Sequence, residues 1–162
     1  MESHVKVFGH PVHPMLIVFP LGLLATSVVF DIVHLVSGNG QWAQAAFFDI
    51  AAGIVGGLLA AVFGLVDWLA IPGGTRAKTV GAWHGGGNVV VVGIFAVSWL
   101  LRLHNPADPG LLPFILSLLA AGIALVTAWL GGELVDRLGV GVDHGAHLDA
   151  PNSLSGRPAR NS

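Results

Sequence analysis

The sequence predicts an all-α integral membrane protein, an antiparallel four-helix bundle with both termini in the cytoplasm. Three observations lead to this fold class. Of the 162 residues, 54% are hydrophobic and 10% are charged, whereas a soluble domain carries about 25% charged residues. Four apolar segments are long enough to cross a bilayer, which takes about 20 residues. Lysine and arginine gather at one end of these segments.

The predicted spans cover residues 15–36, 47–71, 81–103 and 111–134. Linkers containing glycine, proline and asparagine separate them, at residues 37–40, 72–75 and 105–110. Short linkers make consecutive helices antiparallel neighbours. We therefore expect a transmembrane domain at residues 15–138, preceded by an interfacial lead-in at residues 1–14. The composition of residues 139–162, which include Pro, Ser and Gly, predicts a largely disordered cytoplasmic tail.

The orientation follows from the cations. Arg102 alone lies at the far side of the predicted spans, and the side of the two termini carries Lys6, Arg76, Lys78, Arg137, Arg157 and Arg160. Loops rich in lysine and arginine stay in the cytoplasm. Both termini are therefore expected inside the cell.

Composition also excludes several functions. The chain has no cysteine and no tyrosine, which excludes disulfides, thiolate metal sites, covalent haem attachment and tyrosyl chemistry. A net charge of -2 gives no basic face for nucleic acid. No phosphate-binding loop or nucleophile with a nearby histidine is present. The sequence assigns no catalytic residue and leans against an enzyme.

Small residues recur every fourth position along the second and fourth spans, at Ala52, Gly56, Ala60 and Gly64 and at Ala120, Ala124, Ala128 and Gly132. Such stripes let helix backbones approach closely in lipid. They indicate packing within the bundle or, alternatively, the contact surface of a homodimer.

Antiparallel threading should bring most of the remaining polar side chains together at the cytoplasmic end. This predicted cluster contains His10, His13, Asp67, Arg76, His84, Asn88, Glu133 and Arg137. Glu133 and Arg137 are spaced as an ordinary pair on one helix face. The cluster is either structural or a binding site.

The histidines are the candidate ligands. His10 and His13 each precede proline, which disfavours helical geometry, so we expect both on an extended lead-in. His84 is expected in the first turn of its helix, where the dipole favours the neutral, metal-binding imidazole. Asn88 shares its face. The glycines at 85–87 predict close approach of a neighbouring helix or of a flat ring such as haem or quinone.

Asp67 is expected near membrane depth at the end of its helix, where an unpaired carboxylate is costly. Arg76, Lys78 and His84 are the candidates to compensate it across a tight turn. The carboxylate either stabilises this turn or orients His84 as a ligand.

Several motifs together resemble the domain-of-unknown-function 2231 family of predicted bacterial membrane proteins. They are HPVHP at 10–14, FPLG at 19–22, GLVDWLAIP at 64–72, TRAK at 75–78 and GGELV at 131–135, with His84 and Asn88. The resemblance implies a four-helix protein of the inner membrane without an assigned activity. Some relatives are joined to Rieske-type ferredoxin domains, which implies redox work. Some carry histidine before the Phe-Pro of the first helix, where this chain has Val18.

Three functional hypotheses remain open. In the first, a redox module binds haem b or a transition metal through His13 and His84, with His10 as a further metal ligand and Asp67 and Asn88 supporting them, and works with a redox partner. In the second, the cluster is structural, with Arg76, Glu133 and Arg137, and the protein is a membrane scaffold or partner subunit. The third is a small transporter.

Overall fold

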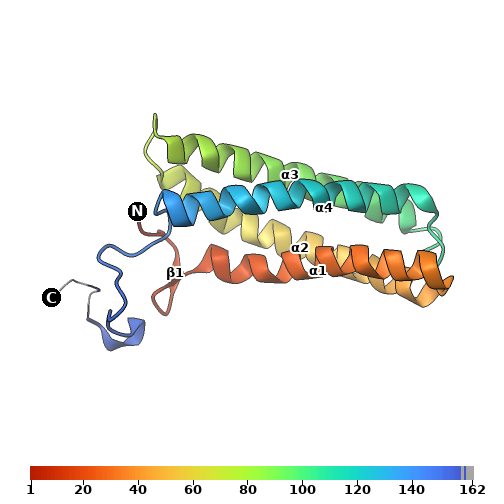
Figure 1. Ribbon diagram of the computed structural model, residues 1–162, viewed down its shortest axis with the longest axis horizontal. Coiled ribbons are helices and arrows are strands. Elements are labelled where there is room, and N and C mark those ends of the chain that lie inside the picture. The colour runs from red at the N-terminus through yellow and green to blue at the C-terminus, as the bar shows by residue number, and fades with distance from the viewer. Residues whose placement is uncertain (158, 160–162) are drawn as a thin grey trace.

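The computed structural model describes residues 1–157 and 159. Four long helices lie side by side (Figure 1): α1, Val12–Ser37; α2, Gly40–Ala70; α3, Arg76–Arg102; and α4, Leu111–Gly132. All four are long and apolar enough to cross a membrane, which confirms the predicted all-α membrane bundle. The N-terminus and the tail lie at the same end of the bundle. We call this the terminal end and the opposite one the far end.

Three helices begin earlier than their hydrophobicity predicts. The Asn39 side chain accepts a hydrogen bond from the Gln41 amide at 3.0 Å and starts α2 at Gly40. The Thr75 hydroxyl accepts one from the Lys78 amide at 3.2 Å and starts α3 at Arg76. Such side chains satisfy the amides that have no partner in the first turn of a helix. Hydropathy marks the part of a helix that lies in lipid, whereas the cap sets its first residue.

The start of α1 corrects a prediction. His13 was expected on an extended segment because Pro14 follows it, but it lies in the first turn of α1. Proline is tolerated there because the first amides of a helix have no intrahelical partner. His10 is extended as predicted, in β2 (His10–Pro11), which pairs with β1 (Lys6–Val7). The tight turn between these strands holds Gly9 at φ 83°.

The bundle consists of two similar helical hairpins, α1–α2 and α3–α4, each more tightly packed within itself than against the other. On α1, His13 is followed by the buried residues Leu24, Ser27 and Asp31. On α3, His84 is followed at the same spacings by the buried residues Phe95, Ser98 and Arg102. The buried residues of α2 recur likewise on α4, where Ala46, Ile50, Gly53 and Ala60 correspond to Pro113, Ser117, Ala120 and Thr127. The second hairpin is therefore a structural repeat of the first.

The core lies between the two hairpins and is built from Leu24, Val28, Ile50, Val91, Phe95 and Ala120. Small residues of the predicted stripe on α2 let α1 approach closely, since a Cβ atom added at Gly56 would lie 2.9 Å from Phe19 and Ala60 is buried. The predicted stripe on α2 thus packs within the chain. On α4, Ala120 is buried but Ala128 is exposed, and the predicted homodimer stays a prediction.

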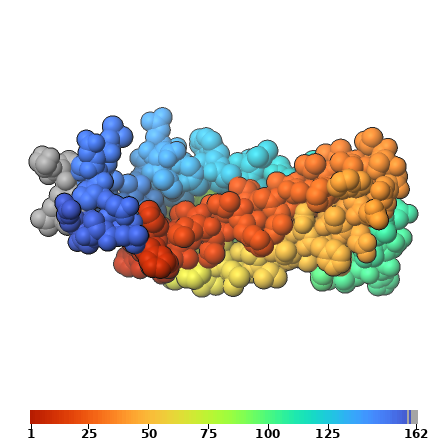
Figure 2. Space-filling model, turned by 90° about the horizontal axis from the view of Figure 1, so that it is seen from below, coloured from red at the N-terminus to blue at the C-terminus, as the bar shows by residue number. Residues whose placement is uncertain are grey.

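A short π-helical turn, η1 (Glu133–Arg137), follows α4. The chain then returns to the N-terminus, where the Met1 amino group donates to the Gly139 carbonyl at 2.7 Å and the Gly141 amide donates to the Met1 carbonyl at 2.8 Å. Further along, η2 (Ser153–Ser155) lies near His10, and Figure 2 shows this tail against the N-terminal segment. The predicted disorder of residues 139–162 stays a prediction; Arg160 lies outside the described residues.

Candidate functional site

Two partly buried imidazole rings from different hairpins lie next to each other, edge to face. The ring centres of His13 on α1 and His84 on α3 are 6.5 Å apart and the ring planes are nearly perpendicular, at 89°. His84 lies about one and a half turns further into its helix than predicted, because α3 begins at Arg76. The helix dipole acts mainly on the first turn, so the predicted dipole effect on His84 does not apply.

Each ring occupies the same kind of place, which we call a histidine notch. In the first notch, Nδ1 of His13 lies 2.9 Å from the Ala60 carbonyl oxygen, and a Cβ atom added at Gly64 would lie 2.8 Å from Cε1 of His13. Because a carbonyl oxygen only accepts, Nδ1 carries the hydrogen. The helix backbone of α2 therefore fixes both the position of the ring and its tautomer.

The second notch repeats this arrangement on α4. Nδ1 of His84 donates to the Thr127 carbonyl at 2.8 Å, and a Cβ atom added at Gly131 would lie 3.1 Å from Cε1 of His84. Asn88 lies 3.3 Å from Nε2 of His84, as the predicted shared face requires. Sequence reasoning missed Thr127, whose hydroxyl donates to Asn88 at 2.8 Å; the available signal was a hydroxyl inside an otherwise apolar span.

Of the three glycines at 85–87, only Gly87 lies against a neighbouring helix. A Cβ atom at Gly87 would lie 2.5 Å from the Thr127 methyl group, so this glycine lets α4 approach α3. Nothing lies within 4 Å of such an atom at Gly85 or Gly86, and both residues are exposed. The structure thus shows the predicted close helix packing at Gly87.

Asp67 has other partners than those predicted. Its carboxylate accepts hydrogen bonds from the Ser3 hydroxyl at 2.7 Å and the His4 amide at 3.1 Å. Asp67 lies two turns from Ala60, on the face of α2 that points toward α1. Because α1 begins only at Val12, the preceding residues fold over this face and reach the carboxylate. Asp67 therefore does not orient His84.

The basic residues near that turn bond elsewhere. The Lys78 ammonium donates to the Trp68 carbonyl at 2.7 Å and lies 3.8 Å from the centre of its ring. Arg76 forms an ion pair with Glu133 at 2.5 Å, where the sequence predicts a pair of Glu133 with Arg137. The π-helical turn alters the spacing on that face. Glu133 and Arg137 both line a shallow cleft of about 340 Å³ at the terminal end.

The N-terminal segment, residues 1–11, forms a cover over the terminal end. Lys6 forms ion pairs with Asp143 and with Glu2, and the His144 amide donates to Glu2 at 3.0 Å. The carboxylates of Asp143 and Glu2 raise the pKa of Lys6 above its ordinary 10.5. Lys6 and the His144 amide lower the pKa of Glu2 below its ordinary 4.5. These bonds attach the cover to the tail.

The far end holds a buried ion pair that sequence reasoning missed. Nη1 and Nη2 of Arg102 donate to the two carboxylate oxygens of Asp31 at 2.6 and 2.7 Å, and the two side chains are 0% and 3% exposed. Ser98 and Ser117 complete the cluster, at 3.4 Å from Nε and 3.3 Å from Nη2 of Arg102. The signal was two opposite charges expected at the same end of an apolar bundle.

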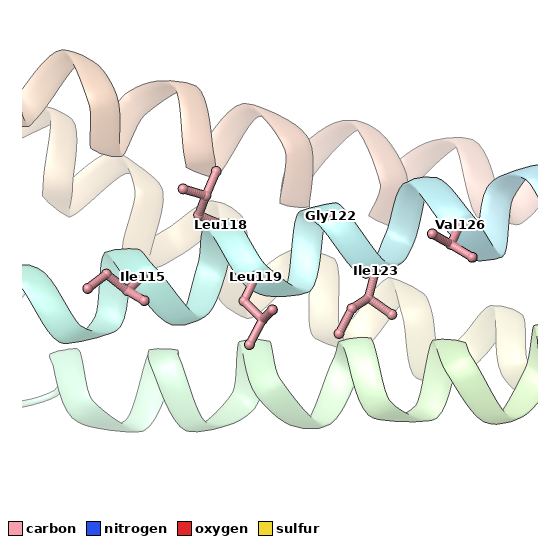
Figure 3. A pocket seen from close by; sticks show the side chains of 6 residues that line it. All are labelled: Ile115, Leu118, Leu119, Gly122, Ile123 and Val126. Carbon is pink, nitrogen blue, oxygen red and sulfur yellow. The ribbon is translucent and has the colours of Figure 1, made fainter.

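Other parts of the molecule offer less chemistry. Across residues 1–157 and 159, no group of three or more His, Cys, Asp or Glu side chains could hold a metal ion; His10 lies away from the notches, near Ser153. Val18 is 69% exposed, so its side chain faces outward and not toward the notches. A groove of about 460 Å³ on α4 is lined by apolar residues alone (Figure 3), with Leu118 pointing toward α1 and Ile123 toward α3.

Comparison with known proteins gives one match. The family model described as "Predicted membrane protein (DUF2231)" matches residues 9–144, which include all four helices and both notches. No curated protein and no solved structure matches the chain. The expected family resemblance is thereby confirmed: the chain belongs to the DUF2231 family of predicted membrane proteins.

Proposed function

We propose that the protein is a redox module of the bacterial inner membrane that holds one b-type haem between His13 and His84. The observation that carries this proposal is the pair of notches. Each imidazole donates its Nδ1 hydrogen to a backbone carbonyl, and the two rings lie edge to face with their centres 6.5 Å apart. Ligand histidines commonly use one nitrogen in this way, which orients the ring and keeps the other nitrogen for the metal.

The number and the placement of the donors fit haem. His13 and His84 come from different hairpins and their ring centres are 6.5 Å apart, so the two histidines would hold a haem between the hairpins. A bare ion needs more ligands than two histidines, and the described residues offer no third one beside them. Haem, which many proteins hold through histidine, would need only His13 and His84 from this chain. A haem bound there would carry one electron.

The chain itself supplies orientation and exclusion of water. The carbonyls of Ala60 and Thr127 hold the rings, and Gly64 and Gly131 let them lie against the helix backbones. The apolar core, which includes Leu24 and Phe95, lies further along the same helices toward the far end. The cover, bound to Asp67 through Ser3, closes the terminal end.

The proposed orientation places the terminal end in the cytoplasm. Lys6, Arg76 and Lys78 lie at the terminal end, and Arg102 lies at the far end. This bias in lysine and arginine supports the orientation, because loops rich in these residues stay in the cytoplasm. A redox partner would exchange electrons with the module. A C-terminal reporter that fluoresces only in the cytoplasm should be bright, and a dark reporter would reverse the orientation.

The test is optical spectroscopy of protein purified from haem-replete cells. We expect a Soret band, a shift of the visible bands on reduction, and about one haem per chain. His13→Ala and His84→Ala should each abolish the band, whereas His104→Ala, an exposed histidine at the far end, should retain it. Protein that stays colourless after reconstitution with added haem would refute the proposal.

A second candidate is a scaffold or partner subunit in which the same residues are structural. The observation that favours it is that His84, Asn88 and Thr127 bond to one another and join α3 to α4 without any added group. It predicts that His84→Ala lowers the melting temperature in detergent while the wild-type protein binds neither haem nor metal. A transporter has less support, because Phe95 and its apolar neighbours fill the interior between the notches and the buried ion pair.

A further inference from the structure

The two histidine notches differ in one respect that the repeat makes visible. Ring position and tautomer are fixed in the same way in both, through Ala60 and Gly64 in the first and Thr127 and Gly131 in the second. The second notch adds two polar side chains. Asn88 stands where the first hairpin has Ile17, and Thr127 stands where it has Ala60. Because His13 is held without such groups, Asn88 and the Thr127 hydroxyl are not needed to hold a ring.

The direction of the hydrogen bonds shows what the added groups do. The Thr127 hydroxyl donates to Oδ1 of Asn88 at 2.8 Å and also lies 3.0 Å from the Ala124 carbonyl. The amide nitrogen of Asn88 thereby faces Nε2 of His84, at 3.3 Å. Nδ1 of His84 already carries the hydrogen of the neutral ring, so Nε2 can only accept. The nitrogen that would bind a metal is therefore occupied by Asn88.

His13 has no such partner. Among the residues that the structure describes, its hydrogen bond is the one from Nδ1 to Ala60, and its other polar neighbour is the ring of His84. The two notches thus present one free ligand nitrogen and one that is capped from within the chain.

We infer that Asn88, oriented by Thr127, caps the ligand nitrogen of His84 and competes with the metal centre for it. This inference rests on the proposed function. Binding of haem iron must break the bond from Asn88 to Nε2, so the cap weakens binding and favours the metal-free form. His13 is the open ligand and His84 the regulated one. Asn88 is in this sense a positioning residue and does not itself bind the metal.

The repeat supplies the variants. Asn88→Ile copies the first hairpin and removes the cap, and Thr127→Ala removes its support while keeping the carbonyl that holds His84. The mirror variant, Ile17→Asn with Ala60→Thr, adds a cap to His13. Val89→Ile, at a lipid-facing position next to Asn88 that is 69% exposed, is the matched control.

Nitrogen-15 NMR of the histidine rings in metal-free protein tests the cap directly. In Asn88→Ile and in Thr127→Ala, the Nε2 resonance of His84 should move toward that of an unbonded ring nitrogen, and in Val89→Ile it should not move. Haem titration tests the competition. Both uncapped variants should bind haem about two- to tenfold more tightly than the wild type, the factor expected for one net hydrogen bond, and the mirror variant should bind more weakly.

The outcomes separate the two proposals. An Nε2 resonance that does not respond to Asn88→Ile overturns the cap, whatever haem does. If the Nε2 resonance responds but the uncapped variants bind haem equally well or more weakly, Asn88 does not compete with the metal centre and instead supports the haem-bound form. A resonance that responds while neither the wild type nor any variant binds haem overturns the proposed function and the competition together, and leaves the cap as a structural hydrogen bond.

Discussion

Replacing one partner of the buried pair Asp31–Arg102 should destabilise the bundle more than any other charge substitution in the described chain. Two parallel hydrogen bonds of 2.6 and 2.7 Å join the side chains. Of the Arg102 side chain 0% is exposed, and of the Asp31 side chain 3%. Removal of either one leaves an unpaired charge buried at the edge of the membrane. Breaking a buried pair in this way costs about 3–5 kcal/mol. Asp31→Leu and Arg102→Leu should each lose that much.

The double variants carry the sharper test. Asp31→Leu with Arg102→Leu removes both charges, and apolar replacements of a buried pair are often neutral, so it should be far more stable than either single variant. Asp31→Arg with Arg102→Asp exchanges two equivalent positions of the repeat and restores the pair. This exchanged variant should recover all but about 1 kcal/mol of the lost stability, the net value of one hydrogen bond. The missing bond is the one from Arg102 to Ser117 of α4, because the equivalent residue of α2 is Ile50, which cannot accept it.

The assay is reversible unfolding in mixed micelles by titration with sodium dodecyl sulfate, followed by circular dichroism. Asp108→Leu, an exposed acidic residue in the loop after α3, is the control and should change the free energy of unfolding by less than about 0.5 kcal/mol. Single variants that lose less than about 1 kcal/mol, or an exchanged pair no more stable than the single variants, would show that the buried pair does not act as the geometry indicates.

Three further predictions concern the terminal end. Gly64→Ala should displace the His13 imidazole that packs there and lower stability by about 1–3 kcal/mol. Its control, Gly22→Ala, adds a Cβ atom that meets nothing within 4 Å and should be neutral or gain up to about 1 kcal/mol. Thermal melting in detergent compares the two variants, and equal melting temperatures would contradict the packing of His13 against Gly64. Asp67→Ala should release the cover and speed proteolysis of residues 1–11 while α2 stays protected, and an unchanged cleavage rate would refute this. Because the pKa of Glu2 is lowered and that of Lys6 raised, their stabilisation is complete between the ordinary values of 4.5 and 10.5. It should be lost as the pH falls through the pKa of Glu2 or rises through that of Lys6. The protection factors of the cover in hydrogen exchange, which correct for the intrinsic pH dependence of the exchange rate, should fall at both extremes, and protection factors that do not change with pH would disprove the attachment.

The histidine cluster shows how far sequence reasoning reached. His84 and Asn88 were expected on one face because they are four residues apart, and the structure brings them together. His13 was expected nearby but outside a helix, because the rule for residues before proline describes helix interiors and not first turns. The partners Ala60 and Thr127 act through backbone carbonyls, which every residue has, so no residue type marks them in the sequence.

Asp67 shows a different difficulty. The sequence indicates that a carboxylate at that depth needs a partner, and it has one. Nearby residues in the chain supplied the expected candidates, whereas the actual partner is Ser3, far away in the sequence. The choice depended on which face of α2 meets α1 and on the residues before α1, and both are consequences of packing.

The sequence alone determined that the chain lies in lipid, that it has four spans, and that consecutive helices run antiparallel. Each of these depends on local composition, since twenty apolar residues must cross a bilayer as a helix and short linkers reverse its direction. Only the tertiary structure decided that the hairpins repeat each other, that Asp31 meets Arg102, and that two imidazoles from different hairpins lie next to each other. These contacts join residues that lie far apart in the chain. They depend on helix rotation and depth, which packing between small residues sets in lipid.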